Sequence, residues 1–404
     1  MNILVLNCGS SSVKYQFINP EEQKVLTRGV VERIGMSDAV LRNKRHDGDD
    51  IAISGEILDH AIAIDYILAV LLSKNHGVIK DKKDIHAIGH RVVHGGETFT
   101  KSVLIADDVL NGIRDNIDLA PLHNPHNLRG ITACYNHLAD TPQVAVFDTA
   151  FHQQMPPHAY LYGIPYSLYR RYKVRRYGFH GTSHRYVAER AAKLMKKPIE
   201  SLKLITCHLG NGCSMAAIDG GVSVDTTMGF TPLEGLLMGT RSGDMDPSVI
   251  LYIMAKEELG SSEANALLNK HSGLMGISGV SSDMRDVLAE AKEDNKQAAF
   301  AVDVFCYRIK KYIGAYTASL GGINAVIFTG GIGENSLEVR SKSLSGLSYM
   351  GITLDEELNK SPEKEKLIST TDSPVSIFVI PTNEELMIAI DTMEIVSQTK
   401  KEFV

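Results

Sequence analysis

Residues 3–18 read ILVLNCGSSSVKYQFI, and residues 202–224 read LKLITCHLGNGCSMAAIDGGVSV. Both stretches begin with a short, continuously apolar run, which predicts a buried strand. A cluster of Gly, Ser, Cys and Asn follows in each and predicts a turn. The residues after the turn alternate between apolar and other side chains, which predicts a second strand. Each stretch is therefore expected to form a β-hairpin.

The two hairpins carry the same residue types at a constant distance. Asn7 and Ser10 lie in the first turn region, and Asn211 and Ser214 lie 204 residues later in the second. This distance is about half of the 404-residue chain, which favours an internal duplication. Asn, Gly and Ser are also the residues that turns use most often, so the sequence leaves a chance match open.

The rest of the chain mixes strands and helices. Apolar runs predict strands at 25–34, 85–93, 144–148, 325–329 and 375–380. A periodicity of 3.6 residues predicts helices at 59–72, 183–197, 246–259 and 283–320. Ser183 is expected to cap the second of these helices, and the last one is expected to break near Asn295. Thr382 and Glu385 have the spacing of a capping box at the start of one more helix. The mixture predicts an α/β fold with two sheets, each covered by helices.

Composition narrows the class of protein. The 404 residues include 42 Lys and Arg against 48 Asp and Glu, and 44% are apolar, which is typical of a soluble globular protein of two or three domains. The net charge of −6 argues against a nucleic-acid-binding protein. The five cysteines form no C-x-x-C pair, so we expect neither a disulfide scaffold nor a four-cysteine zinc site, and a reducing, cytoplasmic location. No signal peptide and no membrane-spanning segment are expected.

Four charged residues are candidates for a functional site because of their places in the predicted strands, helices and turns. Arg91 lies within a mostly apolar predicted strand, where a buried arginine must pair with an acid or bind an anion. Asp148 ends another apolar run and is a candidate functional acid. Glu384 falls in the first turn of the last helix, where it complements the helix dipole or holds Mg²⁺. Arg241 stands beside acids in a turn-rich segment, so a surface ion pair is its alternative explanation.

Glycine-rich turns at 208–212 and 330–335 each follow a predicted strand. Bare backbone N–H groups in such turns can cradle phosphate oxygens, although a plain tight turn is the simpler explanation of each. The P-loop and the dinucleotide fingerprint are both missing. The histidine pair in 180-HGTSH-184 raises the alternative of a zinc hydrolase, but the glutamate of H-E-x-x-H is absent.

Nine segments taken in order resemble the acetokinase family, the acetate kinases. They are NCGSSSVKY (7–15), GHRVVHGGE (89–97), APLHNPHNL (120–128), FDTAFHQQMPP (147–157), YGFHGTSH (177–184), CHLGNGCS (207–214), DTTMGFTPLEGLLMGTRSGDMDP (225–247), FTGGIGEN (328–335) and PTNEEL (381–386). The resemblance implies the actin/Hsp70/sugar-kinase type of α/β fold, with two duplicated actin-like ATPase (ribonuclease H-like) domains and a nucleotide cleft between them. It implies an N-terminal domain of residues 1–150 plus 385–404 and a C-terminal domain of residues 151–384 that carries most of the nucleotide site.

The resemblance also implies a role for each matching residue. The Mg²⁺ ligands would be Asn7 and Glu384. The catalytic residues would be Asp148, His180 and Arg241. The substrate-binding residues would be Arg91, Val93, Leu122, His123, Phe179 and Pro232. The nucleotide-binding residues would be Lys14, His208, Leu209, Gly210, Asn211, Gly212, Asp283, Met284, Arg285, Gly331, Ile332, Gly333, Glu334 and Asn335.

The implied activity is the reversible, Mg²⁺-dependent, direct in-line transfer of the γ-phosphoryl group of ATP to acetate, giving acetyl phosphate and ADP. Mn²⁺ would substitute for Mg²⁺, and the protein would be a homodimer. A small carboxylate is already ionised at neutral pH, so we expect Asp148 to orient an arginine or a metal-bound water rather than act as a base. The size of Val93 favours acetate. The alternatives are a propionate or other short-chain carboxylate kinase, a non-kinase actin-like ATPase and a histidine–metal hydrolase.

Overall fold

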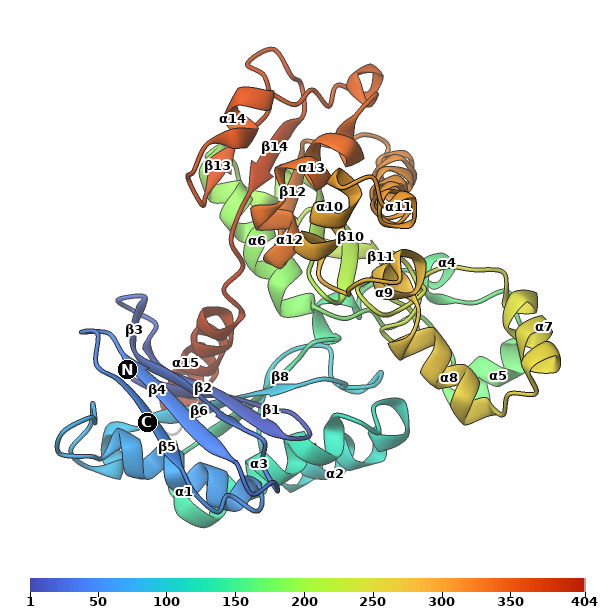
Figure 1. The fold of residues 1–404 in the computed structure, drawn as a ribbon. Helices are drawn as coiled ribbons and strands as arrows, with labels where there is room; N and C mark the ends of the chain where they lie inside the picture. The colour runs from blue at the N-terminus through green and yellow to red at the C-terminus, as the bar shows by residue number, and fades with distance from the viewer. Residues whose placement is uncertain (403–404) are drawn as a thin grey trace. The chain divides into compact units, whose positions relative to one another are not determined.

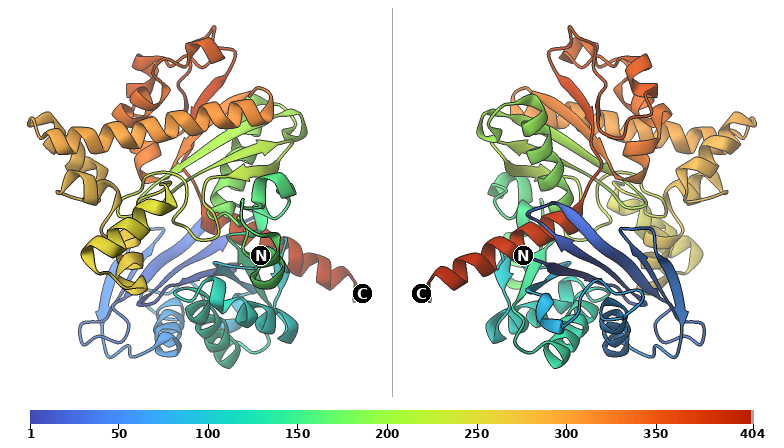
Figure 2. Two further views of the ribbon diagram at one scale, coloured as in Figure 1. Left: turned by 90° about the vertical axis from the view of Figure 1, so that its right-hand side faces the viewer. Right: turned by 90° about the vertical axis from the view of Figure 1, so that its left-hand side faces the viewer.

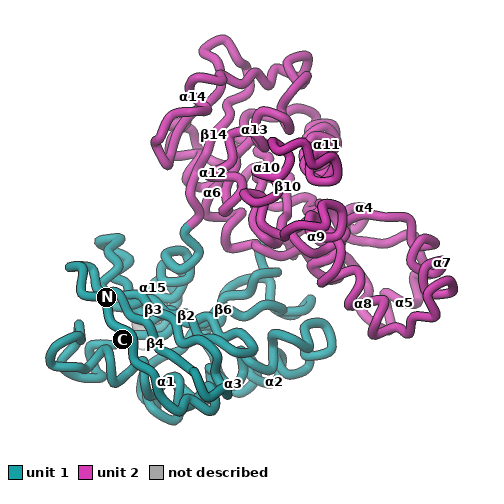
Figure 3. Tube along the Cα trace, in the orientation of Figure 1, with its two compact units in different colours: residues 1–151, 383–404 teal, residues 152–382 magenta. Residues whose placement is uncertain are grey.

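The computed structural model (Figure 1) describes residues 1–402. The chain forms two compact units, shown in different colours in Figure 3. Unit 1 comprises Met1–Phe151 and Asn383–Val404, and unit 2 comprises His152–Thr382. Each unit has its own sheet, so the predicted α/β fold with two sheets is confirmed. Within residues 1–402, no helix has both the length and the apolar character that crossing a membrane requires.

The sheet of unit 1 has the strand order β5-β4-β3-β2-β1-β6-β8-β7. Its strands are β1 (Ile3–Cys8), β2 (Ser12–Asn19), β3 (Lys24–Glu32), β4 (Val40–Arg45), β5 (Asp50–Ser54), β6 (Ala87–Val92), β7 (Val103–Leu104) and β8 (Gln143–Phe147). β1 and β2 form the predicted antiparallel hairpin. β6 pairs in parallel with β1, and β8 pairs in parallel with β6, so the carboxyl ends of these three strands meet at one edge.

Helices cover both faces of this sheet. They are α1 (His60–Leu71), α2 (Asp107–Asp115), α3 (Asn124–His137) and α15 (Glu384–Glu402). Apolar side chains of β2, such as Val13 and Phe17, are buried against α1 and α3. Figure 1 shows α15 on the opposite face, and it can approach there because position 89 of β6 is a glycine. A Cβ atom on Gly89 would lie 2.5 Å from Oγ1 of Thr392 and 2.7 Å from Cγ2 of Ile388, both in α15.

The sheet of unit 2 has the strand order β11-β10-β9-β12-β14-β13. Its strands are β9 (Lys203–Leu209), β10 (Cys213–Asp219), β11 (Val222–Thr226), β12 (Ala325–Thr329), β13 (Lys366–Leu367) and β14 (Ser376–Val379). β9 and β10 form the second predicted hairpin, with β12 parallel to β9 and β14 parallel to β12.

The helices of unit 2 pack on this sheet and extend beyond it. They are α4 (Pro157–Tyr160), α5 (Tyr166–Tyr172), α6 (Gly181–Met195), α7 (Pro247–Glu257), α8 (Ser261–Lys270), α9 (Gly273–Ser278), α10 (Met284–Lys292), α11 (Lys296–Leu320), α12 (Gly330–Asn335), α13 (Leu337–Leu344) and α14 (Glu356–Lys360). α11 and α6 both pack on β9 and β10, and the two views of Figure 2 show them on opposite faces of the sheet. The short α12 follows β12 directly, so the glycine-rich segment starts at the edge where the parallel strands end.

Strand order resolves the question of duplication. The orders β3-β2-β1-β6-β8 and β11-β10-β9-β12-β14 correspond strand for strand, with the same antiparallel and parallel pairings. The residue equivalence expected from the 204-residue spacing is wrong, however. Asn7 lies inside β1 opposite Lys14, whereas Asn211 lies in the turn after β9. In strand register, His208 opposite Ser214 occupies the place of Asn7 opposite Lys14.

The structure differs from the sequence at both predicted helix caps and agrees with it at the predicted break. α6 begins at Gly181 with His180 as its cap, so Ser183 lies in the first turn and is not the cap. The Ser183 hydroxyl instead bonds Nδ1 of His208 at 2.8 Å. The capping box of Thr382 and Glu385 is also wrong, because the side chain of Asn383 accepts the hydrogen bond from the Leu386 N–H at 3.1 Å. The break near residue 295 is confirmed, with Asn295 capping α11.

We expect Gly89→Ala to lower the free energy of unfolding by about 1–3 kcal/mol, because the added carbon has no room under α15. Gly314→Ala in α11 is the matched control, since nothing lies within 4 Å of its added carbon. Alanine is the better helix former, so that variant should gain about 0.5–1 kcal/mol. Urea unfolding followed by circular dichroism measures both. Unchanged stability of Gly89→Ala would contradict the packing of α15 on β6.

Candidate active site

An ion pair joins the ends of two neighbouring strands in unit 1. Arg91 lies near the end of β6, and Asp148 follows the end of β8, which runs parallel beside it. Nε of Arg91 donates to Oδ1 and Oδ2 of Asp148 at 2.9 and 3.1 Å, and Nη2 donates to Oδ2 at 2.6 Å. The Asp148 side chain is only 3% exposed, and that of Arg91 is 25% exposed. The arginine therefore has the acidic partner that its apolar surroundings require, while its Nη1 makes no hydrogen bond within residues 1–402.

Glu384 approaches the same arginine from the start of α15. Its Oε2 lies 4.0 Å from Nε of Arg91, and its side chain is 19% exposed. The pKa of the Glu384 carboxyl is raised to about 7: burial is the largest cause, Arg91 acts in the opposite direction, and Asp148 adds to the rise. The two carboxylates together outweigh burial and raise the pKa of Arg91. Two acids thus share one cation.

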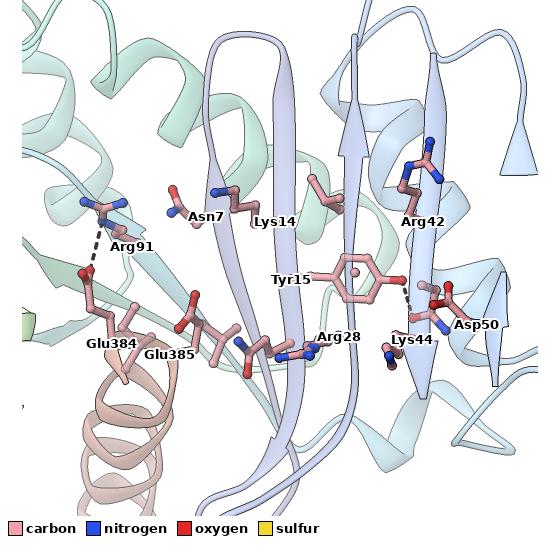
Figure 4. Close-up of a pocket in the computed structure, with 16 residues that line it drawn as sticks. Asn7, Lys14, Tyr15, Arg28, Arg42, Lys44, Asp50, Arg91, Glu384 and Glu385 are labelled. Atoms are coloured by element: carbon pink, nitrogen blue, oxygen red, sulfur yellow. Dashed lines mark hydrogen bonds and ion pairs between the residues drawn. The ribbon is translucent and has the colours of Figure 1, made fainter. Parts of the chain in front are cut away.

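A cavity of about 360 Å³ lies in unit 1, between strands of its sheet and the start of α15. Figure 4 shows Arg91, Glu384, Asn7 and Lys14 at one end of it, so the structure brings these four predicted site residues together. Asn7 and Lys14 face each other in the register of β1 and β2. Asn7 offers a carbonyl oxygen and Glu384 a carboxylate, which are the ligands that Mg²⁺ prefers.

The donor set therefore fits Mg²⁺. The raised pKa of Glu384 records a buried carboxylate that a further cation would stabilise. Mg²⁺ needs only one or two protein ligands, because it keeps waters and takes phosphate oxygens from its substrate. In the described part of the chain, no group of three His, Cys, Asp or Glu side chains is arranged to hold a metal.

Sequence reasoning missed the other end of this cavity. Arg28 of β3 lies opposite Lys44 of β4, and Arg42 of β4 lies two residue pairs further along the strands. Figure 4 shows these cations and Asp50 away from Arg91. The available signal was the alternation of uncharged and charged residues over 41–44 (Leu41, Arg42, Asn43 and Lys44), which is typical of a strand with one solvent-facing side.

In unit 2 the glycine turn after β9 is bordered by two functional candidates. A Cβ atom on Gly212 would lie 3.5 Å from Nη1 of Arg241 and 3.7 Å from Nε2 of His180. The missing side chain thus leaves bare backbone between a guanidinium and an imidazole, whose ring stacks on that of His208 at 4.2 Å. This arrangement is suited to binding an oxyanion.

Arg241 lacks the ion pair that its acidic neighbours in the sequence offered as an alternative. Its Nη1 donates to the Pro232 carbonyl oxygen at 3.1 Å, and it forms no ion pair with any residue that the structure describes. Burial lowers its pKa from the usual value. A half-buried guanidinium without a carboxylate is a cation in need of an anionic ligand.

A larger cavity of about 850 Å³ collects most of the predicted nucleotide residues of unit 2. The predicted residues that line it are Gly210, Asn211, Asp283, Met284, Arg285, Gly331, Ile332 and Asn335. The residues that sequence reasoning missed are Ser282, Leu288, Ser336 and Glu338. They directly neighbour the matched segments in the sequence or lie one helical turn beyond, which was the available signal.

The remaining nucleotide candidates of unit 2 lie beside this cavity. Leu209 and Gly333 are buried in the structure. Oε1 of Glu334 accepts hydrogen bonds from the N–H groups of Gly330 at 2.9 Å and Thr382 at 3.3 Å, so this acid holds the glycine segment in place. The buried Arg340, which sequence reasoning missed, donates to the carbonyl oxygens of Gly333 and Glu334 at 2.8 and 3.0 Å.

The predicted acyl-pocket residues divide between the units. In unit 1, Val93 is half-buried, its N–H donating to the Asn127 side chain at 3.1 Å. His123 is exposed, and Leu122 is 70% exposed. In unit 2, Phe179 is buried with its carbonyl oxygen 3.0 Å from Nε2 of His152, and Pro232 contacts Arg241 as described above.

Comparison with known proteins gives one consistent family. The sequence profile of the acetokinase family matches residues 2–390. An acetate kinase from Thermoanaerobacterium thermosaccharolyticum is 57% identical over 401 residues, covering 99% of this chain and 100% of that protein. Among solved structures, Porphyromonas gingivalis acetate kinase superposes with a TM-score of 0.95 at 46% identity, covering 98% of this chain and 99% of that one. A propionate kinase from Francisella tularensis superposes with a TM-score of 0.90 at 43% identity, covering 97% and 99%.

Glu384→Gln tests the burial of that carboxyl group. Because its pKa is raised from 4.5 to about 7, the folded chain keeps a proton that the unfolded chain has already released. The free energy of unfolding therefore falls as the pH rises from 4.5 to about 7, by up to about 3 kcal/mol. The isosteric variant should escape this loss. Urea unfolding of both proteins at about pH 5 and about pH 7.5, with a chelator present, measures it. A stability difference between the two proteins that is independent of pH would contradict the assignment.

Proposed function

The chain belongs to the acetokinase family, and on that premise we propose that it transfers the γ-phosphoryl group of ATP to acetate, giving acetyl phosphate and ADP. As a member of this family it is a kinase whose phosphoryl acceptor is a carboxyl group. The observation that carries the proposal is the half-buried Arg241 without an acidic partner in residues 1–402, bordering Gly212 together with Nε2 of His180. The same residues serve the reverse reaction, since a catalyst accelerates both directions.

Charge explains how these residues would act. Phosphoryl transfer needs little covalent chemistry from the protein, so positioning and charge neutralisation supply most of the acceleration. Arg241 and His180 would donate to the transferring phosphoryl group, each contributing roughly 3 kcal/mol if aimed at the transition state. Arg91 would hold the substrate carboxylate through the Nη1 that Asp148 leaves open. Asp148 then positions Arg91 and takes no proton, because the acceptor is already a carboxylate.

Asn7 and Glu384 would hold Mg²⁺, with Mn²⁺ as a substitute. When bound, the metal supplies positive charge that neutralises phosphate oxygens. Lys14, which faces Asn7 across the hairpin, would add a second positive charge near the phosphates. The binding of Mg²⁺ is supported by the oxygen donors and by the buried carboxyl of Glu384, whose raised pKa shows that Arg91 offsets its burial only in part.

The nucleotide would bind to unit 2. Its supporting observation is the 850 Å³ cavity between the glycine turn at 210–212, the segment 283–285 and α12. ADP and ATP need such a volume, since nucleotide-sized ligands occupy cavities of roughly 300–1,000 Å³. The bare glycine backbones at Gly210, Gly212 and Gly331 leave room for phosphates and for the sugar. The two compact units support our proposal of two domains, residues 1–150 with 385–404 and residues 151–384.

Acetate is our choice among short carboxylates. An acetate kinase among the relatives is 57% identical to this chain over almost its whole length, whereas the propionate kinase is 43% identical. Val93 would contact the methyl group, and Leu122, His123, Phe179 and Pro232 would complete the pocket. One extra methylene changes discrimination by only about 1–3 kcal/mol, so propionate is expected as a slower substrate.

We also propose a homodimer in the cytoplasm. Large apolar side chains are exposed on α5 and α7, which is typical of a surface that another subunit covers. The exposed fractions of these side chains are 58% for Tyr166, 53% for Tyr172, 66% for Leu251 and 64% for Tyr252.

The proposed cytoplasmic location, a reducing compartment, is supported by the five cysteines, all of which are free and buried.

Trapping of the acyl phosphate tests the proposed function. The protein is incubated with ATP, Mg²⁺, acetate and hydroxylamine, which converts acetyl phosphate to a coloured hydroxamate. We expect product only when ATP, Mg²⁺ and acetate are all present. Release of phosphate that does not depend on acetate, without hydroxamate, would instead support the non-kinase ATPase. Val93→Ala should raise kcat/KM for propionate relative to acetate by about 10-fold, because the smaller side chain leaves room in the pocket for the longer acid. An unchanged ratio would remove Val93 from the pocket.

Asp148→Asn separates positioning from proton transfer. The variant loses the bidentate grip on Arg91, and we expect kcat to fall by about 100-fold or more. The shape of the pH–rate profile below neutrality should not change, because no proton passes through Asp148. Asp391→Asn, another buried acid in unit 1 that accepts from Oγ of Ser102 at 2.5 Å, controls for lost stability. Disappearance of an ionisation from the acid limb in Asp148→Asn alone would make Asp148 a proton-transfer group.

A further inference from the structure

A chain of hydrogen bonds leads away from His180 into the interior of unit 2. Nδ1 of His180 lies 2.8 Å from Oγ of Ser214. The same oxygen lies 2.8 Å from Nε2 of His184, and Nδ1 of His184 lies 2.7 Å from Oγ1 of Thr206. Ser214, His184 and Thr206 are fully buried, each at 0% exposure. None of these three residues has a role in the function proposed above.

Which group donates in each of these hydrogen bonds follows from Thr206, the most deeply placed residue of the series. Within residues 1–402, Oγ1 of Thr206 has no hydrogen-bond partner other than Nδ1 of His184. A buried hydroxyl hydrogen must find an acceptor, so Thr206 donates to that nitrogen. Burial, assisted by His152 and His208, holds the pKa of His184 well below its usual value, so its ring is neutral. A neutral imidazole that accepts at Nδ1 carries its hydrogen on Nε2.

The donors and acceptors of the other hydrogen bonds then follow in order from His184 through Ser214 to His180. Nε2–H of His184 donates to Oγ of Ser214, and this leaves the Ser214 hydroxyl hydrogen to be donated to Nδ1 of His180. With Nδ1 accepting, neutral His180 carries its hydrogen on Nε2, the nitrogen near Gly212 and Arg241. The opposite tautomer of His180 would reverse all the bonds and leave the Thr206 hydroxyl without an acceptor.

We propose that Thr206, His184 and Ser214 form a relay that holds His180 in its Nε2–H tautomer and aims this N–H at the phosphoryl group. The three are positioning residues, and the inference rests on the proposed role of His180. The backbone of His180 supports it independently. His180 adopts φ 56° and ψ 23°, a left-handed conformation that costs a non-glycine residue stability and is retained where it places a side chain.

Two substitutions at the inner end of the relay give the sharpest test. Thr206→Val is isosteric and removes the hydroxyl, whereas Thr206→Ser keeps it. Thr226→Val is the matched control, because the buried hydroxyl of Thr226 in the same sheet donates to the Met215 carbonyl oxygen at 2.9 Å and lies outside the relay. Ser214→Ala breaks the relay at its centre.

The tautomer is read directly by long-range ¹H–¹⁵N correlation NMR of the full chain with labelled histidine, without substrates. His180→Gln assigns the His180 signals. We expect the Nε2–H pattern in the unchanged protein, Thr206→Ser and Thr226→Val, and a mixture of tautomers in Thr206→Val and Ser214→Ala. In steady-state kinetics, Thr206→Val should lower kcat by about 10- to 100-fold, by analogy with metal-binding histidines that lose their outer hydrogen-bond partner, with KM values within about threefold.

Retention of the Nε2–H pattern in Thr206→Val, or equal disturbance in Thr226→Val, would overturn the relay. Loss of folding in Ser214→Ala alone leaves the test intact, because Thr206→Val fills the same volume as threonine. If the pattern responds as expected but no hydroxamate forms, the relay stands and the proposed function fails. If hydroxamate forms but the pattern does not respond, only the relay fails.

Discussion

Parallel pairing of neighbouring strands is the constraint on which the candidate site depends. It aligns the carboxyl ends of β1, β6 and β8 at one edge, and those of β9, β12 and β14 at another. Arg91 can meet Asp148, 57 residues away, only because β6 and β8 lie side by side. In the second unit the same pairing puts the glycine turn after β9 beside α12. Site residues in such sheets are collected by topology from distant parts of the chain.

Much of the fold was predictable because local patterns report it directly. Continuous apolar runs and glycine-rich turns identified both hairpins and the central strands. Helix starts were less predictable, because several polar residues compete for each cap. Ser183 forms a hydrogen bond with His208, a residue 25 positions away, and Asn383 caps α15 in place of Thr382. β4 and β5 were missed because their alternation is that of strands near a sheet edge, with many charged residues.

The site was predictable as a set of residues and not as a set of contacts. The resemblance identified Arg91 and Asp148, but the bidentate ion pair required the strand order. The acids next to Arg241 in the sequence pointed to a surface ion pair, which the fold does not form. The relay could not be predicted for a different reason. Thr206 lies in an apolar strand, where nothing in the sequence distinguishes a functional threonine from a structural one. Its importance comes from three-dimensional packing, which gives the Thr206 hydroxyl Nδ1 of His184 as its one acceptor within residues 1–402.

The two corresponding hairpins have different residues at equivalent positions, and the surroundings of these residues no longer allow one to replace the other. Register places Lys14 and Ser214 at the same point of the two hairpins. Lys14 is exposed, whereas Ser214 has no exposed surface and contacts two imidazoles. A lysine in the second hairpin would have to give up its charge or its burial. The two hairpins can therefore no longer be exchanged one for the other: the first hairpin, placed alone among the residues that surround the second, would put an ammonium group in the core of unit 2.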